Sequence, residues 1–216
     1  MKNLLLPLLL LLFLCSQPVC AQNPDTLRAI YSAYIGVREL THHNDGPEVE
    51  RFLAHVGLKK GAPWCAAFVS YCLHKAGYTD APRSGWSPDY FPKRQRVWAL
   101  SQKYTPPHAD STPPYHAQIG DLFGIWYANL GRIAHVGFVD CPDPSTHNRA
   151  QQHEKPPNAT TPRINIIPPS HFGAYITTVE GNTNDNGSRE GIGVFRKYRP
   201  LKSIKYIARW TTPRSA

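Results

Sequence analysis

The patterns that predict helices and those that predict strands occupy separate parts of this chain. Apolar residues recur at helical spacing in three segments before Gly77, whereas runs rich in β-branched and aromatic residues begin after Gly120. Helices that come first and strands that follow favour an antiparallel sheet with the helices packed on it. The sequence therefore predicts an α+β fold, with N-terminal helices on an antiparallel sheet of about five strands.

Each helical segment begins at a proline, which suits a first helical turn because the N–H groups there have no intrahelical partner. The first segment follows an N-capping Asn23 and spans about fifteen residues. The other two end at glycines, which favour the left-handed residue that closes a helix. We expect helices over residues 24–38, 47–57 and 63–76, and a further short helix over residues 94–104.

Five runs in the second half of the chain predict strands, at residues 122–127, 133–139, 175–180, 193–198 and 204–210. A turn signal joins the first two as a hairpin. Because side chains alternate between faces, His135 shares a face with Gly137 and Val139, and we expect a helix to lie close against that face. The basic residues within 196–199 and 202–205 are interpreted as solvent-facing positions of strands.

The start of the chain has the pattern of a secretory signal peptide. A short basic start precedes an apolar run over residues 4–14, and small residues follow at a cleavage site. The run is too short to span a bilayer, and no later stretch is long enough. We expect residues 1–21 to be removed and the protein to be secreted or periplasmic. Lipid anchoring ranks second, since neither Cys15 nor Cys20 follows the small residue that precedes a lipidated cysteine.

The remaining residues, 22–216, have the length of one ordinary domain, and we expect a monomer. Residues 141–169 are polar and rich in proline, so we interpret them as a surface loop inserted in that domain. The formal charge is +9 and the isoelectric point is near 9.4. In an exported protein this charge favours a cell wall or membrane surface as partner, rather than nucleic acid.

Three of the five cysteines remain after the predicted cleavage: Cys65, Cys72 and Cys141. Cys65 and Cys72 belong to one predicted helix and lie roughly 10 Å apart, too far for a disulfide. Cys72 and Cys141 either form a disulfide or stay as two buried thiols. The cysteines and histidines lack the paired spacing of a zinc site, and the adjacent His42 and His43 are interpreted as solvated loop residues.

Cys65 lies in the first turn of its predicted helix. The unpaired N–H groups and the positive end of the helix dipole there both favour a thiolate over a thiol. Cys72, within the apolar stripe and away from both ends, has the position of an ordinary core cysteine. We therefore predict that Cys65 is a nucleophile rather than a core residue.

A histidine and an acid on the predicted sheet complete the parts of a thiol hydrolase. Cys65 would attack an acyl carbon, and His135 would take its proton or pair with it as an imidazolium. Glu180 would hold the imidazole in the required tautomer, and Asn182 would share that task or contact the substrate. The Cys65 N–H, at a helix start, is a natural donor to the oxyanion of such a reaction.

In combination, these residues resemble the cysteine, histidine and Glu-x-Asn blocks of the CHAP-domain family of cell-wall hydrolases. The blocks are found at residues 63–70, 120–121, 134–139 and 179–182. The resemblance implies a papain-like fold and cleavage of peptidoglycan, either as an N-acetylmuramoyl-L-alanine amidase or as a stem- or cross-bridge endopeptidase. It implies no cofactor, and the two kinds of enzyme share the same blocks, which leaves the cleaved bond open.

Carried over by position, the resemblance implies Cys65 as nucleophile, His135 as base, Glu180 as orienting residue and Asn182 as fourth member. Some members bind calcium through an acidic loop ahead of the cysteine. Residues 44–50 lack that spacing, so we expect no required metal.

Two tryptophans are predicted substrate contacts. Trp64 precedes the nucleophile directly, and Trp86 lies in an irregular loop rich in helix-breaking residues. For Trp86 a position in a cleft and a position capping the core are equally compatible with the sequence.

Two other functions remain open. A wall-binding module with a vestigial site would keep the polar positions but hydrolyse nothing. An NlpC-like endopeptidase usually has a second histidine as its orienting group. Here Glu180 occupies that position, and three further histidines lie in or next to the predicted insertion, at His147, His153 and His171.

Overall fold

A computed structural model describes residues 22–100, 117–141, 175–184 and 191–211. The predicted signal segment, residues 142–169 of the predicted insertion, and the three histidines His147, His153 and His171 lie outside the described residues. Within the described ranges, no helix has the length and apolar character needed to cross a bilayer.

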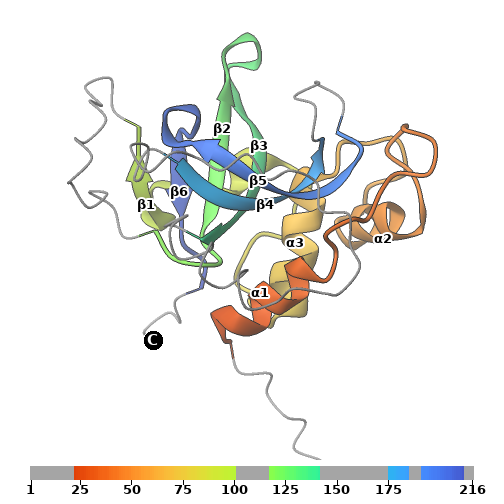
Figure 1. The fold of residues 1–216 in the computed structure, drawn as a ribbon, viewed down its shortest axis with the longest axis horizontal. Helices are drawn as coiled ribbons and strands as arrows, with labels where there is room; N and C mark the ends of the chain where they lie inside the picture. The colour runs from red at the N-terminus through yellow and green to blue at the C-terminus, as the bar shows by residue number, and fades with distance from the viewer. Residues whose placement is uncertain (1–21, 101–116, 142–174, 185–190, 212–216) are drawn as a thin grey trace, which may run out of the picture.

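In the described part of the chain, three helices precede a single sheet, which confirms the predicted α+β class (Figure 1). The helices are α1 (Pro24–Ser32), α2 (Pro47–His55) and α3 (Cys65–Lys75). The strands are β1 (Arg96–Ala99), β2 (Leu122–Tyr127), β3 (Arg132–Cys141), β4 (Tyr175–Thr183), β5 (Gly193–Pro200) and β6 (Tyr206–Ala208). The six strands lie in the order β1-β6-β2-β3-β4-β5, and every neighbouring pair is antiparallel.

The strand β1 lies where we predicted a short helix. Residues 93–95 form a 3-10 turn, after which the chain extends and pairs with β6, Arg96 opposite Ala208. The Arg96 guanidinium also lies over the Tyr206 ring, 3.9 Å from its centroid. The helix prediction is wrong over residues 96–99 because pairing with a sheet edge outweighs a weak local helix propensity. The sheet consequently has one strand more than expected.

The first helix is also shorter than predicted, because the chain after it joins the sheet. Gly36 has a φ of +94°, which glycine adopts without strain. The Gly36 N–H donates to the Val194 carbonyl at 3.0 Å, and the Val194 N–H donates to the Val37 carbonyl at 2.9 Å. These bonds to β5 replace the helical ones.

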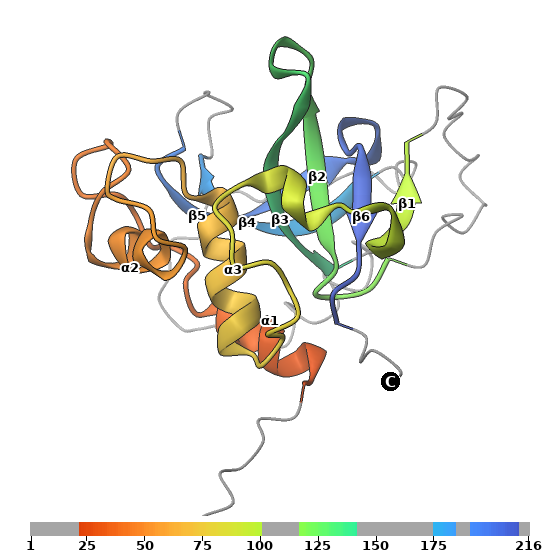
Figure 2. The same ribbon diagram turned by 180° about the vertical axis from the view of Figure 1, so that it is seen from behind.

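The helix α3 lies against the sheet, with α1 and α2 beside it (Figure 2). Aromatic side chains pack these elements together. Phe68 of α3 meets Phe138 of β3 edge to face at 5.9 Å, and Phe52 of α2 at 5.3 Å. Tyr31 of α1 stacks on the same Phe138 ring at 4.6 Å. Phe138 of the sheet thus contacts rings of α1 and α3, and α2 joins this cluster through Phe68.

The helices cover the face of β3 that carries Phe138, and not the His135 face as we predicted. Val139, on the opposite face, belongs to a second apolar cluster that includes Phe123. The small residue Gly137 makes room for that ring, since a Cβ there would lie 2.8 Å from Phe123. A neighbouring side chain, rather than a helix, therefore fills the space beside Gly137.

A buried carboxylate on β3 links that strand to α1 and to β5. Asp140 of β3 accepts hydrogen bonds from Tyr31 at 2.9 Å, from Arg28 at 3.1 Å and from Arg196 at 2.9 Å. Arg196 was predicted to face solvent; the residue is exposed, and its guanidinium also pairs with a carboxylate that has no exposed surface.

Candidate active site

Cys65 is the first residue of α3, and Trp64 is its N-cap. The helix begins two residues later than predicted, which places the cysteine at its very start. Its N–H is one of the first-turn groups that lack an intrahelical acceptor. The side chain is largely buried, with its Sγ atom 3.6 Å from the hydroxyl oxygen of Ser87.

Two polar side chains fix the turn that precedes Cys65. With its amide oriented so that both ends have partners, Asn182 accepts from the Trp64 N–H at 2.9 Å and donates to the Gly191 carbonyl at 3.3 Å. The Trp64 indole N–H donates to Glu39 at 2.8 Å. Asn182 itself has a φ of +52°, a conformation that costs free energy outside glycine. Asn182 therefore positions the turn that carries the nucleophile.

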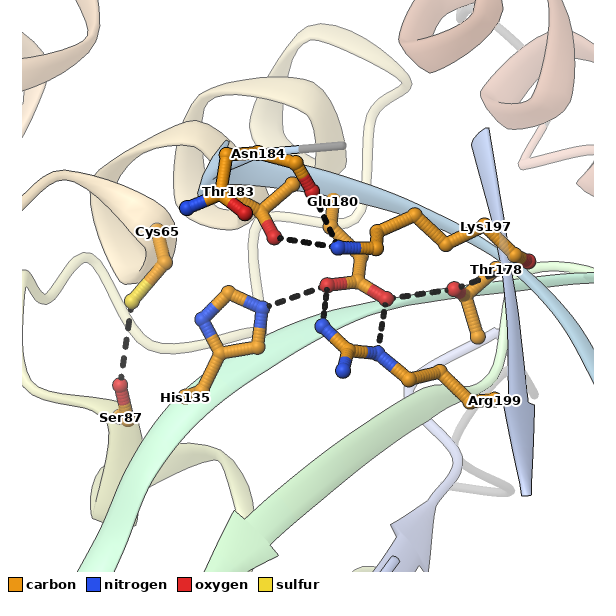
Figure 3. A network of polar contacts seen from close by, with 9 residues as sticks. All are labelled: Cys65, Ser87, His135, Thr178, Glu180, Thr183, Asn184, Lys197 and Arg199. Atoms are coloured by element: carbon orange, nitrogen blue, oxygen red, sulfur yellow. Dashed lines mark hydrogen bonds and ion pairs between the residues drawn. The ribbon is translucent and has the colours of Figure 1, made fainter. Parts of the chain in front are cut away.

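His135, on β3, lies between Cys65 and Glu180 (Figure 3). Its Nε2 atom is 2.9 Å from a carboxylate oxygen of Glu180 on β4, which leaves Nδ1 on the side of Cys65. The imidazole is nearly buried, and the Glu180 side chain has no exposed surface. The structure thus brings together three residues that the sequence predicted as catalytic, from α3, β3 and β4.

Glu180 is itself held by two residues that were not predicted. Arg199 of β5 donates to both carboxylate oxygens, at 2.7 and 2.6 Å, and the Thr178 hydroxyl donates at 2.6 Å. Such a bidentate pair fixes both the charge and the plane of the carboxylate. Arg199 was interpreted as solvent-facing, and that interpretation is wrong because its guanidinium turns inward to this acid.

These contacts favour a charged pair of Cys65 and His135. Burial acts to raise the pKa of the Cys65 thiol, but the hydrogen bond and charge of His135, with smaller effects of Ser87 and the Val136 N–H, lower it. Burial acts to lower the pKa of His135, but hydrogen bonds to Cys65 and Glu180 raise it to about 9. A thiolate beside an imidazolium is consequently the favoured state at neutral pH.

Glu180 keeps its negative charge despite full burial. Burial opposes ionisation, yet the hydrogen bonds from Arg199 and His135 hold the pKa of this carboxyl well below its usual range. The orienting group is therefore a carboxylate at any pH where the protein would act.

A cleft of about 800 Å³ opens over the cysteine and the imidazole. Asn182, Gly191 and the loop residues His42 and Asn44 line one part of it. The remaining lining residues come from the segments around Ala62, the 3-10 turn η1 (Ser87–Tyr90) and the β2–β3 hairpin, and include Pro63, Arg83, Ser84, Trp86, Ser87, Tyr127, Leu130 and Arg132.

The two predicted substrate contacts have different outcomes. Trp86 lines the cleft and is 49% exposed, so the position in a cleft is the one it adopts. Trp64 has no exposed surface and binds Glu39 through its indole N–H, so the prediction that its side chain contacts substrate is wrong. Its large ring packs on Phe52 at 5.9 Å, and the residue acts through its backbone, which anchors the start of α3.

The loop before α2 reaches the cleft in a fixed conformation. His42 and Asn44 both have left-handed backbones, with φ of 63° and 54°. Asp45 accepts from the Thr41 N–H and hydroxyl at 2.9 and 2.7 Å, and Glu39 accepts from the Asn44 N–H at 3.0 Å. His42 was interpreted as a solvated loop residue; it is exposed, but it also lines the cleft.

Cys72 lies within α3 as a buried free thiol, which leaves it unbridged. Burial raises the pKa of this thiol well above its ordinary value, as expected for a core cysteine. In the described part of the chain, no group of three or more His, Cys, Asp or Glu side chains is arranged to hold a metal ion.

Comparisons with protein-family models, with curated proteins and with solved structures found no match to this chain. The resemblance to CHAP-domain hydrolases therefore stays a prediction from the residues of the motifs.

Proposed function

We propose that this protein is an exported cysteine hydrolase that cleaves amide bonds in peptidoglycan, as an N-acetylmuramoyl-L-alanine amidase or a peptide endopeptidase. The observation that carries the proposal is His135, which binds a buried carboxylate through Nε2 and faces Cys65 on the floor of a cleft. A cysteine helix packed on the sheet that bears the histidine also supports a papain-like fold as part of the proposal.

The reaction follows from these positions. The Cys65 thiolate attacks the carbonyl carbon of the amide, and the resulting oxyanion lies near the Cys65 N–H at the start of α3. The His135 imidazolium gives its proton to the amine as the C–N bond breaks, which leaves a thioester. Water then attacks the thioester and gives a proton to His135, so the S–C bond breaks and the acid is released.

Glu180 contributes by keeping the imidazole ring in the orientation that both proton transfers require. Arg199 and Thr178 hold that carboxylate in place, and Asn182 fixes the turn that precedes the nucleophile. The site therefore needs no movement of its charged groups before the first attack, which is the arrangement that lowers a barrier most effectively.

The substrate class rests on three features of the sequence. The blocks around Cys65, His135 and Glu180 resemble those of CHAP-domain enzymes, the N-terminal segment has the pattern of an export signal, and the net charge is +9. A positive protein outside the cytoplasm suits the anionic polymers of a cell wall.

The test is digestion of purified sacculi, with mass spectrometry of the released fragments. The wild-type protein should release muropeptides or free stem peptides, and the fragment masses identify the cleaved bond. Cys65→Ala should abolish release, whereas Cys72→Ala, which removes a thiol outside the site, should retain it. Undiminished release by Cys65→Ala would reject the mechanism, and binding of the wild type without release would favour a wall-binding module.

A further inference from the structure

Among the described residues that line the cleft, the charged ones outside the catalytic pair are two arginines. Arg83 and Arg132 line it, and no Asp or Glu is among the described residues that do so. Asp89, which lies close in sequence, instead accepts a hydrogen bond from the Ser84 hydroxyl at 2.5 Å. The described part of the cleft thus favours a ligand that carries negative charge.

Arg132 is held in a defined plane by an aromatic partner. Its guanidinium carbon lies 3.9 Å from the centroid of the Trp86 ring, and one nitrogen donates to the Ile133 carbonyl at 3.1 Å. A stacked guanidinium keeps the N–H donors along its edge available to a ligand. Because the stack already orders the Arg132 side chain in the free protein, ligand binding costs less conformational entropy. Within the described residues, no carboxylate forms an ion pair with Arg132.

Arg83 faces the same cleft from the loop before η1 (Ser87–Tyr90). Its Nε atom donates to the His55 carbonyl at 2.6 Å, which fixes the side chain near its end. Arginine is the side chain that proteins commonly use for bidentate recognition of carboxylates, and this cleft presents two of them.

Each member of the Trp86–Arg132 stack is close in sequence to a residue of the catalytic site. Trp86 directly precedes Ser87, whose hydroxyl lies 3.6 Å from the Cys65 sulfur. Arg132 is on the same strand as His135, about 10 Å along it at roughly 3.3 Å per residue. A group bound at Arg132 would therefore lie within two or three peptide units of an amide held at Cys65.

We propose that Trp86 and Arg132, with Arg83, form a subsite for a free carboxylate of the substrate, close to the amide that is cleaved. The inference rests on the proposed hydrolase function and deepens it, because it assigns the cleft a preference for acidic peptides. Arg132 is the specificity-determining residue, and Trp86 is the surface that orients it.

The test is a matched pair of muropeptides, one with its free carboxyl groups intact and one with all of them converted to methylamides. The wild type should cleave the acidic form with a kcat/KM about tenfold or more above that of the amidated form, as expected for a charge-assisted contact. In Arg132→Gln this preference should fall below about twofold, through a rise in the KM of the acidic form.

Arg96→Gln is the matched control, because Arg96 also lies 3.9 Å from an aromatic centroid, that of Tyr206, but does not line the cleft. It should retain the full preference. Equal cleavage of the two forms by the wild type would overturn the subsite, and so would an unchanged preference in Arg132→Gln. Failure of the wild type to cleave either form would instead reject the hydrolase function.

A binding measurement separates recognition from catalysis. Calorimetry of Cys65→Ala with the acidic muropeptide should give a dissociation constant about tenfold or more below that of the double variant Cys65→Ala/Arg132→Gln. Equal constants for the two proteins would show that the Trp86–Arg132 stack only supports the β2–β3 hairpin.

Discussion

At the scale of single residues, the site depends on three charges that are stable only together. A buried carboxylate, imidazolium or thiolate alone would be neutralised by burial. Arg199 keeps Glu180 ionised, Glu180 favours the protonated imidazole, and the imidazolium favours the Cys65 thiolate. The nucleophile therefore depends on a residue of β5, far from it in the sequence.

The charged pair predicts the pH dependence of alkylation of Cys65. Because the Cys65 pKa is lowered, iodoacetamide should modify it below pH 7 far faster than an ordinary thiol, with a second change near pH 9 as His135 loses its proton. In His135→Ala the profile should shift to higher pH, since the dominant stabilising charge is gone. Peptide mass spectrometry distinguishes Cys65 from Cys72, and an unshifted profile in this variant would contradict the pairing.

Ser87 is predicted to be a positioning residue for the thiolate. Its hydroxyl lies 3.6 Å from the Cys65 sulfur and lowers the pKa of the thiol. Ser87→Ala should lower kcat by about tenfold, as loss of a hydrogen bond to a charged atom predicts, and shift the acid limb of the rate profile to higher pH. Ser203→Ala removes a hydroxyl that binds the Pro200 carbonyl outside the cleft and should change neither. A purely structural role of Ser87 would leave the acid limb in place.

At the scale of elements, the close packing of α3 against β4 sets the position of the nucleophile. Gly181 of β4 lies against the first turns of α3, where an added Cβ would be 2.8 Å from Phe68 and from the Trp64 ring. No other residue fits this approach without moving the helix, because both neighbours are fully buried. The middle residue of the Glu-x-Asn pattern, Gly181, is therefore required for its small size, just as Glu180 and Asn182 are required for their polar side chains.

Gly181→Ala is therefore expected to destabilise the protein and to disturb the site. Overpacking of a close-packed core costs about 1–3 kcal/mol, which urea unfolding can measure. Activity at a temperature where the variant is still folded should also fall, because the turn held by Asn182 shifts with α3. Unchanged stability would show that α3 and β4 can separate without cost, contrary to their contact in the structure.

At the scale of the whole molecule, the excess of positive charge predicts salt-sensitive attachment to the wall. With a net charge of +9, sedimentation of the inactive Cys65→Ala protein with purified sacculi should decrease steeply as salt rises from about 0.05 to about 0.5 M. Screening shortens the reach of exposed charges over that range, whereas apolar contacts would be strengthened or unaffected. Binding that does not change with salt would show that net charge does not attach the protein.

The sequence determined the elements with strong local signals and the identity of the catalytic groups. Prolines at three predicted helix starts and β-rich runs after Gly120 predicted the α+β class. A cysteine in the first turn of one of these helices, with a histidine and an acid on predicted strands, predicted the trio of Cys65, His135 and Glu180. These signals are local, because caps, periodicity and reactive side chains act within a few residues. Trp86 in the cleft was compatible with the sequence, though not distinguished by it.

Only the tertiary structure decided which distant side chains meet. The inward turn of Arg199, the burial of Trp64, the conversion of residues 96–99 to an edge strand and the face of β3 that the helices cover all depend on partners far along the chain. A basic residue on a strand has the same local pattern whether it faces water or a buried acid. The difference is made by Glu180, whose charge can be buried because strand pairing brings Arg199 and His135 to it.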